Sequence, residues 1–450
     1  MRTVGKIRMG HAVVIVRATY DRRVSPSPAG IYCARFDAEG MDFETPPEVE
    51  ALLDDLDDFI EREIRPLEDE HPQYFDERRE HARTDWENGG VPDAEWEALL
   101  DEQRRRADEA GFYRFALPEE LGGQDGSNLA MAHVREHFAH RGVGLHNVIQ
   151  QEASIVGNFP IAQAIHRFGS DEHKGMLEDI ITRETPVAFG LTEPDHGSDA
   201  TWMDTTARKE DGEWVIDGAK RWNSGMHVAE YDLVFARTGG TDGDHEGITG
   251  FLVPTDADGF EVDFYHWTFN MPTDHAEVSI DGVRVPESAV VGEEGQGLRL
   301  AQAFLYENRI RQAASSLGAA QFCIDESVAY ANERETWGEP LAERQAIQFP
   351  LAELHTEAEM LRSLVYRTAW LLDQDGKFSG SDKVSMANYS ANNLVCRAAD
   401  RAMQVHGGMG YSRAKPFEHI YRHHRRYRIT EGAEEIQKRR VAGHLFGYLD

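Results

Sequence analysis

Apolar residues in the first third of the chain recur at helical spacing. After Thr45 and Pro46, which suit the start of a helix, apolar side chains return every three or four positions with acidic residues between them. These apolar positions are Val49, Leu52, Leu53, Leu56 and Ile60. Similar patterns follow near residues 93–111, 128–141, 151–168 and 171–183. We therefore predict an all-helical region that ends near residue 185.

The pattern changes to short apolar runs between about residues 186 and 293. Such runs cover 213–216, 233–236 and 250–253, and clusters of Gly, Asp and Thr separate them. Two more runs, 278–280 and 283–285, flank Asp281-Gly282, a dipeptide typical of a β-hairpin turn. No helix-length segment interrupts the runs, which argues against a parallel βαβ sheet. We predict a compact β-domain here.

Long helical patterns resume at Gly297. They cover about 297–333, 342–375, 381–407 and 431–447, and the glycines of residues 407–410 end the third of them. The predicted fold class is therefore α+β with several domains. The expected order is an N-terminal helical domain (41–185), a β-domain (186–293) and a C-terminal helical bundle (294–450).

The chain carries a strong negative charge. It holds 47 Lys and Arg against 80 Asp and Glu, a net charge of −33, and eight of the 47 are Lys. Acidic surfaces with few lysines resemble proteins of salt-loving cytoplasms, where salt screens self-repulsion. The charge argues against nucleic acid and anionic membranes as partners. No apolar run approaches the ~20 residues that span a bilayer, and three separated cysteines suggest no disulfide framework. We expect a cytoplasmic protein.

Residues 1–40 differ from the remainder in charge. They hold seven Lys and Arg against three Asp and Glu, a balance of +4, whereas the remainder holds 40 against 77, a balance of −37. The change falls abruptly at Met41. This leader is interpreted as a flexible tail, a targeting segment or the result of a start assigned upstream of Met41. The first and third interpretations are favoured by the abrupt change, and the leader is excluded from the fold argument.

One string in the middle region has an unusual composition. Residues 188–200 read Ala-Phe-Gly-Leu-Thr-Glu-Pro-Asp-His-Gly-Ser-Asp-Ala, so an apolar, strand-like run passes directly into a polar loop. Leu191 and Thr192 offer backbone N–H groups and a hydroxyl to the edge of a flat ligand. Ser198, after the flexible Gly197, can reach a phosphate or a pantetheine chain. A strand followed by an acidic surface loop explains the string less well.

Four further strings carry candidate chemistry. Residues 218–225 read Gly-Ala-Lys-Arg-Trp-Asn-Ser-Gly, 334–338 read Arg-Glu-Thr-Trp-Gly, 404–410 read Gln-Val-His-Gly-Gly-Met-Gly, and 429–436 read Ile-Thr-Glu-Gly-Ala-Glu-Glu-Ile. Taken alone, each has a structural explanation, such as a core Trp222 or a glycine helix cap. Taken together, the five strings resemble the signature segments of the FAD-dependent acyl-CoA dehydrogenase family. The resemblance extends more weakly back to Met41.

The resemblance implies a fold and a cofactor. The family combines a helical domain, an antiparallel β-barrel-like domain and a four-helix bundle, assembled here as a homotetramer or homodimer. The residues that it places against FAD are Phe189, Leu191, Thr192, Gly197, Ser198, Trp222, Ser224, Arg334, Thr336, Trp337, Gln345, Gln404, Gly407 and Gly408. By this resemblance Trp222 packs against the isoalloxazine and Ser224 bonds near N5. The segments around Arg334 and Gly407 hold the pyrophosphate and adenosine, in part across a subunit interface.

The resemblance also implies a catalytic base. The match is Glu431, which precedes a glycine as in the short- and medium-chain branches, and Arg422 matches nine residues earlier. Implied substrate contacts are Ser198, Arg309 and Gly432. Other branches place the base just before the arginine that matches Arg309. Here that residue is Asn308, which cannot act as a base, and Glu307 is the weaker alternative.

The implied reaction is the α,β-dehydrogenation of an acyl-CoA thioester to a trans-2-enoyl-CoA. Glu431 removes the α-proton, the β-hydrogen leaves as hydride to flavin N5, and an electron-transfer flavoprotein accepts the electrons. The chain departs from the family at Thr430, where Tyr is frequent, and at Tyr306, where Asp is frequent. These departures leave the acyl chain and head group open. One alternative is an oxygen-using oxidase of this fold, such as an acyl-CoA oxidase or a nitroalkane oxidase-like enzyme. The other, a non-catalytic DNA-binding relative, is disfavoured by the charge.

Two groups of histidines receive a structural interpretation. His133 and His137 share a helix face, but the order of residues around them is not that of a metalloprotease, and no metal site is predicted. His423 and His424 stand among Arg422, Arg425 and Arg426. They are interpreted as part of a solvated basic face or an oligomer contact.

Overall fold

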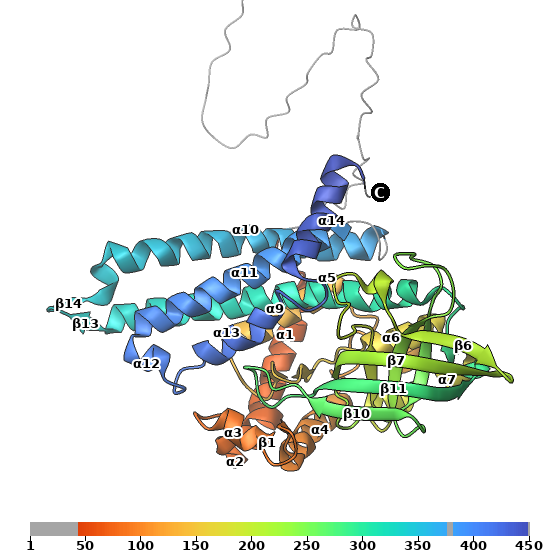
Figure 1. Cartoon of the computed structure of the whole chain (residues 1–450). Coiled ribbons are helices and arrows are strands. Elements are labelled where there is room, and N and C mark those ends of the chain that lie inside the picture. Colours follow the sequence, from red (N-terminus) through yellow and green to blue (C-terminus); the bar gives the residue numbers. More distant parts are fainter. Residues whose placement is uncertain (1–43, 376–380, 449–450) are drawn as a thin grey trace, which may run out of the picture. The chain divides into compact units, whose positions relative to one another are not determined.

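Helices, a sheet and again helices follow one another along the chain (Figure 1). The computed structural model describes residues 44–375 and 381–448, except for the side chains of 303–307 and of residue 375. The leader predicted at 1–40 lies outside the described residues. The elements below all belong to the unit that begins at Pro47.

The first group of elements is mainly helical. Its helices are α1 (Pro47–Phe59), α2 (Arg65–Glu70), α3 (Arg79–Arg83), α4 (Ala94–Glu109), α5 (Asn128–His140), α6 (Pro160–Phe168), α7 (Asp171–Lys174) and α8 (Leu177–Thr182). A π-helical turn (Ile60–Ile64) joins α1 to α2. Asp93 caps α4 by accepting hydrogen bonds from the backbone N–H groups of Glu95 and Trp96. Buried apolar side chains such as Leu56, Trp96 and Phe138 form the core of this group.

The helix expected over 151–168 is wrong in its first half. Helix α6 begins only at Pro160, whose ring fits the first turn of a helix but not its interior. The residues before it form β4 (Ala153–Ser154), which pairs with β3 (Asn147–Val148). A second small ladder joins β1 (Thr84–Asp85) to β2 (Val91–Pro92). The N-terminal region is therefore not purely helical, and the loop before α6 is free to contribute to a site.

The middle of the chain forms one eight-stranded sheet. Its strands are β5 (Val187–Gly190), β6 (Thr206–Glu210), β7 (Glu213–Ser224), β8 (Tyr231–Arg237), β9 (Ile248–Pro254), β10 (Phe260–Tyr265), β11 (His275–Pro286) and β12 (Val290–Val291). They are ordered β10-β11-β7-β6-β8-β9-β12, and β5 pairs with β8. Except for the parallel pairings of β8 with β5 and β6, the neighbours are antiparallel.

The hairpin turn expected at Asp281-Gly282 is wrong, because both residues lie within the single strand β11. Ile280 pairs with Gly218 and Val283 pairs with Ile216, so the dipeptide forms an irregularity in the ladder with β7. The Gly282 N–H donates to Oδ1 of Asp217 at 2.8 Å. Gly282 has a φ of +63°, which suits a bulge as well as a turn. The Asp-Gly signal therefore identified a local backbone conformation, not a reversal of the chain.

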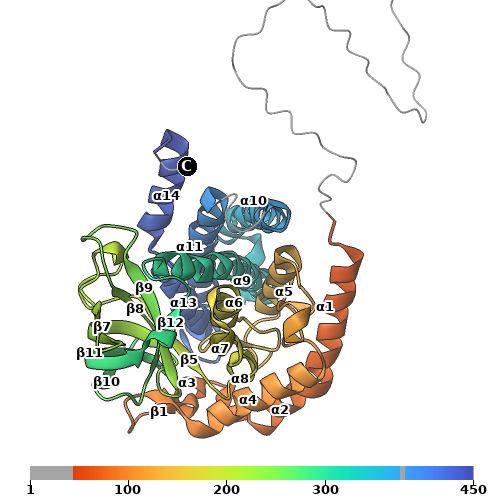
Figure 2. The ribbon, with the colours of Figure 1, turned by 90° about the vertical axis from the view of Figure 1, so that its right-hand side faces the viewer.

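Long helices dominate the third group of elements. They are α9 (Gly297–Glu333), α10 (Gln345–Asp375) and α11 (Ser381–His406), followed by the shorter α12 (Gly408–Tyr411), α13 (Phe417–Arg426) and α14 (Glu434–Phe446). Helix α11 packs against α9, α10, α13 and α14, and α5 packs against α9. A small ladder of β13 (Glu335–Thr336) and β14 (Glu339–Pro340) joins α9 to α10. In Figure 2, α14 rises above the other helices. Among the described helices, none is long and apolar enough to cross a membrane.

Helix α13 was not predicted, and it overturns the interpretation of His423 and His424 as a solvated basic face. Both side chains are fully buried. His424 Nδ1 lies 3.0 Å from the Ser316 hydroxyl, and His423 Nε2 lies 2.9 Å from the Tyr427 hydroxyl. Burial lowers the pKa of His423 well below its ordinary value. Phe417, Ile420 and these histidines form a buried helix face. The sequence pattern does not indicate this face, because arginines stand next to the histidines.

Candidate active site

A β-bulge turns Trp222 out of the sheet. Along β11, Ala276 pairs with Asn223 and Glu277 pairs with Arg221, which leaves Trp222 without a partner in this ladder. Its φ is +69° and its side chain is 46 % exposed. The indole lies 4.3 Å from the His266 ring. Bulges and unusual backbone conformations often aim side chains at functional sites, and this one presents a wide aromatic surface.

Next to this tryptophan, a hydroxyl and an imidazole form a pair. Ser224 ends β7 and lies opposite His275 at the start of β11. The Ser224 hydroxyl is 2.8 Å from Nδ1 of His275. Burial is the main cause that lowers the pKa of His275, so the ring is held neutral. The pair provides polar atoms beside an apolar face.

The loop after β5 is tied to β7 by a buried ion pair. Lys220 Nζ donates to Oε1 of Glu193 at 2.8 Å and to the Leu191 carbonyl at 3.4 Å. The Glu193 carboxylate also accepts the N–H groups of Asp204 and Thr205, at 2.6 and 3.0 Å. Both charged side chains are buried. The ion pair thereby joins the first and second strings where the end of β5 meets β7; this place is called the β5–β7 edge.

The remaining residues of the first string lie around this edge. The Thr192 carbonyl accepts the Arg221 N–H at 2.9 Å, and the Phe189 ring lies 5.2 Å from that of Phe235. Gly197 and Ser198 are exposed, and a side chain at Gly197 would lie over the Thr192 methyl group. Leu191, Thr192 and Ser198 are therefore accessible in part at the end of β5.

Glu431 lies between α13 and α14, and neighbouring side chains bind its main-chain carbonyl group. Its φ is +56°. Its carbonyl oxygen accepts from Nε and Nη2 of Arg309, at 2.8 and 2.5 Å, and from Nε2 of Gln437 at 3.0 Å. A side chain at Gly432, whose φ is +93°, would lie 3.2 Å from the same donors, so glycine is required there. Arg309, one of the three expected substrate contacts, thus binds the backbone of the expected base.

The carboxyl group of Glu431 has the properties of a general base. Its Oε2 is buried and has no hydrogen-bond partner within 44–375 and 381–448. Burial, with a contribution from the charge of Glu152, raises the pKa of Glu431 to about 7, while Arg309, Arg426 and a hydrogen bond from Asn308 oppose this rise. A base with a pKa near neutrality is well matched to proton abstraction. The side chain of the alternative base, Glu307, lies outside the described residues.

Sequence reasoning missed an ion pair next to this base. Glu152 Oε1 accepts from Nη2 of Arg426 at 2.6 Å and from the Tyr427 hydroxyl at 3.1 Å. Glu152 lies in the segment that had been predicted as a helix. Its position beside Arg426 and Tyr427, 274 and 275 positions later, is set by tertiary packing, and no local pattern indicates it.

The third and fourth strings lie together at another place. The Tyr330 ring, near the end of α9, is 4.3 Å from the His406 ring at the end of α11. Arg334 follows the first of these helices and Gly407 the second. The tip of β13 and β14 lies far from β7 in Figure 1. Within one chain, the third and fourth strings therefore lie near each other but far from the strand that carries Trp222.

The residues of these two strings are mostly exposed. Trp337 is 92 % exposed and has a φ of +53°. The Thr336 hydroxyl is buried, without a hydrogen-bond partner in the part of the chain that the structure describes. Also exposed are Arg334, Gln345, Gln404, Gly407 and Gly408. An exposed tryptophan and open glycines suit contact with a ligand or a second subunit.

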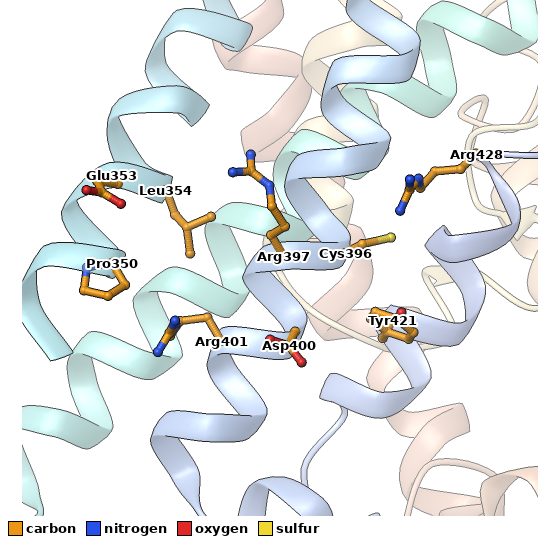
Figure 3. A pocket seen from close by; sticks show the side chains of 9 residues that line it. All are labelled: Pro350, Glu353, Leu354, Cys396, Arg397, Asp400, Arg401, Tyr421 and Arg428. Atoms are coloured by element: carbon orange, nitrogen blue, oxygen red, sulfur yellow. The ribbon is translucent and has the colours of Figure 1, made fainter. Parts of the chain in front are cut away.

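A surface pocket lies apart from all of these strings. Figure 3 shows it between α10, α11 and α13, with a cavity volume of about 400 Å³. The side chains of Leu354, Cys396, Arg397 and Tyr421 are among its lining. None of the predicted cofactor or substrate residues lines it, so it does not identify the active site.

The residues at the edge of the sheet fit a flavin. The exposed indole of Trp222 suits the apolar face of an isoalloxazine ring. The polar edge of that ring needs hydrogen bonds, which Thr192 and Ser224 can form. The buried carboxylate oxygen of Glu431, unpaired among the residues that the structure describes, adds a proton acceptor. The arrangement is suited to removing a weakly acidic proton beside a redox cofactor.

Comparison with known proteins supports this interpretation. Three family models match successive parts of the chain: the N-terminal domain of acyl-CoA dehydrogenase over residues 46–184, its middle domain over 188–283 and its C-terminal domain over 295–446. The 3-(aryl)acrylate reductase of Clostridium sporogenes is 31 % identical over 86 % of this chain and 96 % of its own length. The probable acyl-CoA dehydrogenase YngJ of Bacillus subtilis is 30 % identical over 90 % of this chain and 100 % of its own. The solved structure of a putative acyl-CoA dehydrogenase from Mycobacterium abscessus superposes with a TM-score of 0.78 and 27 % identity, covering 91 % of this chain and 100 % of that one.

Proposed function

Because the chain belongs to the acyl-CoA dehydrogenase family, whose members are FAD-dependent oxidoreductases, we propose that it oxidises an acyl-CoA thioester to the trans-2-enoyl-CoA with Glu431 as the base. The single observation that carries this proposal is the buried carboxylate of Glu431, whose pKa is raised to about 7. When bound, FAD supplies a hydride acceptor at N5. The other steps depend on groups of the protein.

Glu431 has two tasks in this proposal. Its carboxylate takes the α-proton, and its burial keeps water from competing for that proton. An α-C–H group is far too weak an acid for a carboxylate unless the thioester carbonyl is hydrogen-bonded as it becomes enolate-like. We expect the backbone N–H of Glu431 to donate one such bond. The anchoring of this backbone by Arg309 and Gln437 supports that expectation, because a donor that stabilises a transition state must be fixed in advance.

The flavin ring is expected at the edge of the sheet. Phe189, Leu191 and Thr192 would hold its polar edge, Trp222 its face and Ser224 the region near N5. Gly197 and Ser198 would face the flavin or the CoA chain, with Arg309 and Gly432 completing the substrate site. The aromatic surface that the bulge at Trp222 exposes supports this placement.

The distal part of FAD is expected at the other group of strings. There Arg334, Thr336, Trp337, Gln345, Gln404, Gly407 and Gly408 would hold the pyrophosphate and adenosine of a neighbouring subunit. Their distance from β7 within one chain and the exposure of Trp337 support a shared site. This arrangement requires at least a homodimer, and a homotetramer satisfies it twice. An electron-transfer flavoprotein is the proposed electron acceptor.

The test is anaerobic flavin reduction by acyl-CoA. Purified protein should be yellow and should bleach when a suitable acyl-CoA is added without oxygen. Glu431→Gln removes the base but keeps the main-chain anchor, so it should bind FAD and ligand normally and bleach about 10²- to 10⁴-fold more slowly. The control is Glu435→Gln, at an exposed carboxylate four positions later, which should bleach like the wild type. Full-speed bleaching by Glu431→Gln would refute the assignment of the base.

A further inference from the structure

A second carboxylate lies at the candidate site. Glu152 has a φ of +52°, a conformation that costs energy for a residue other than glycine and tends to persist at functional positions. Its ion pair with Arg426 is partly buried, with side-chain exposures of 43 % for Glu152 and 19 % for Arg426. Both charges act on the pKa of Glu431, but neither side chain takes or gives the proton in the proposed reaction.

This pair lies near both the base and the Ser224–His275 pair. The charges of Glu152 and Arg426 act on Glu431, and they also act on His275, which is hydrogen-bonded to Ser224. An acyl group must reach Glu431 with its α-carbon and the flavin with its β-carbon. Such an acyl group passes close to Glu152 and Arg426, since the charges of both residues reach Glu431 and His275.

Both partners retain hydrogen-bonding capacity. A carboxylate offers about four lone-pair positions, and the contacts with Arg426 and Tyr427 both involve Oε1 of Glu152. Nε of Arg426 is buried and meets no hydrogen-bond partner in the described parts of the chain. Asn308 adds a polar side chain that is hydrogen-bonded to the carboxyl group of the base. An alkyl chain would cover these groups without satisfying them, which is costly.

We propose that Glu152 and Arg426 determine specificity, by selecting a short acyl-CoA that carries a hydroxyl or amide group beyond its β-carbon. This proposal rests on the proposed function of the site. A hydroxyl or amide both donates and accepts, so the Glu152 carboxylate receives its hydrogen while Nε of Arg426 donates to its oxygen. A carboxylate in the same place would be repelled by Glu152.

The test compares three acyl-CoA probes with the FAD-loaded wild-type protein. 4-Hydroxybutyryl-CoA and pentanoyl-CoA differ only by a hydroxyl in place of a methyl group, and glutaryl-CoA carries a carboxylate at the end of a five-carbon chain. The measured quantity is the rate constant of anaerobic flavin bleaching at limiting substrate. We expect the hydroxy compound to be faster than pentanoyl-CoA by about 10- to 100-fold, as for a hydrogen bond to a charged group, and glutaryl-CoA to be slowest.

A double variant connects the preference to the ion pair. Glu152→Leu with Arg426→Leu removes both charges together, which avoids leaving one buried charge alone. It should reverse the preference in favour of pentanoyl-CoA. The matched control is Asp57→Leu with Arg141→Leu, which removes a 2.8 Å pair of similar exposure (35 % and 23 %) between α1 and the residue that follows α5. The control should keep the wild-type preference.

The outcomes separate the two proposals. Faster bleaching of the wild type by pentanoyl-CoA or glutaryl-CoA than by 4-hydroxybutyryl-CoA would overturn the specificity proposal and leave the proposed function intact. An unchanged preference in the double variant would overturn the role of the ion pair. Absence of bleaching by every acyl-CoA tried would refute the proposed function and the specificity proposal with it. The wild-type comparison does not depend on whether any variant folds.

Discussion

Burial and four neighbouring side chains together set the pKa of Glu431. Burial and the negative charge of Glu152 raise its pKa, whereas Arg309, Arg426 and Asn308 lower it, and the balance lies at about 7. Below this pH the carboxyl group is protonated and cannot accept the α-proton. The kcat/KM for acyl-CoA should therefore rise with pH through about 7 and level off above it.

Replacing Glu152 tests this balance. Glu152→Gln removes a like charge, so the pKa of Glu431 should fall and the acidic limb of kcat/KM should move to lower pH by about one unit. The measurement is a pH profile of anaerobic flavin reduction, since kcat/KM reports the free enzyme. Glu435→Gln, at an exposed position, should leave the limb in place. A limb that moves to higher pH in Glu152→Gln would contradict this account of the base.

At the scale of the element, the edge formed by β5 and β7 depends on one buried ion pair. Glu193 and Lys220 join the loop after β5 to the middle of β7. Such pairs contribute little net stability, but removing one partner leaves an uncompensated buried charge. The pair therefore acts as a positioning device for Leu191 and Thr192.

Lys220→Met tests whether the β5–β7 edge depends on this ion pair. The variant leaves Glu193 buried and unpaired, so it should lose about 3–5 kcal/mol of unfolding free energy and bind FAD more weakly. Glu193→Gln together with Lys220→Met should recover most of the stability. Chemical denaturation and FAD titration measure the two effects, and Lys209→Met, at an exposed lysine, is the control. Stability equal to the wild type in Lys220→Met would rule out a buried, ionised pair.

The elements differ in how far they follow from sequence. The long helices α9, α10 and α11 are predicted well, because their apolar periodicity persists over many turns. The loop before α6 and the continuous β11 are not, because Pro160 and the bulge at Gly282 act through backbone geometry that a hydrophobic pattern does not record. Among site residues, Glu431 stands in a recognisable string. Glu152 does not, since only tertiary packing brings it to Arg426.

At the scale of the whole molecule, the chain carries a large excess of negative charge. The 80 acidic residues exceed the 47 basic residues by 33, and the surface charges repel one another most at low ionic strength, where the Debye length is long. We propose on this basis that the protein is adapted to high salt.

Salt should therefore stabilise the protein. The midpoint of thermal unfolding should rise by several degrees as KCl increases from 0.1 M to 2 M, since the Debye length falls from ~10 Å to a few Å. Sucrose of equal osmolality is the control, because it is excluded from protein surfaces without screening charge. A midpoint that falls with KCl, or that rises equally in sucrose, would contradict electrostatic screening as the cause.

The anchor of Glu431 also bears on how this position can evolve. Arg309 and Gln437 bind the carbonyl oxygen of residue 431, an atom that every amino acid possesses. They hold the chain in place whichever side chain it carries and whatever its charge. A substitution at position 431 can therefore exchange the chemistry of the site while its architecture survives, so that an inactive descendant would still fold and remain available for a new reaction.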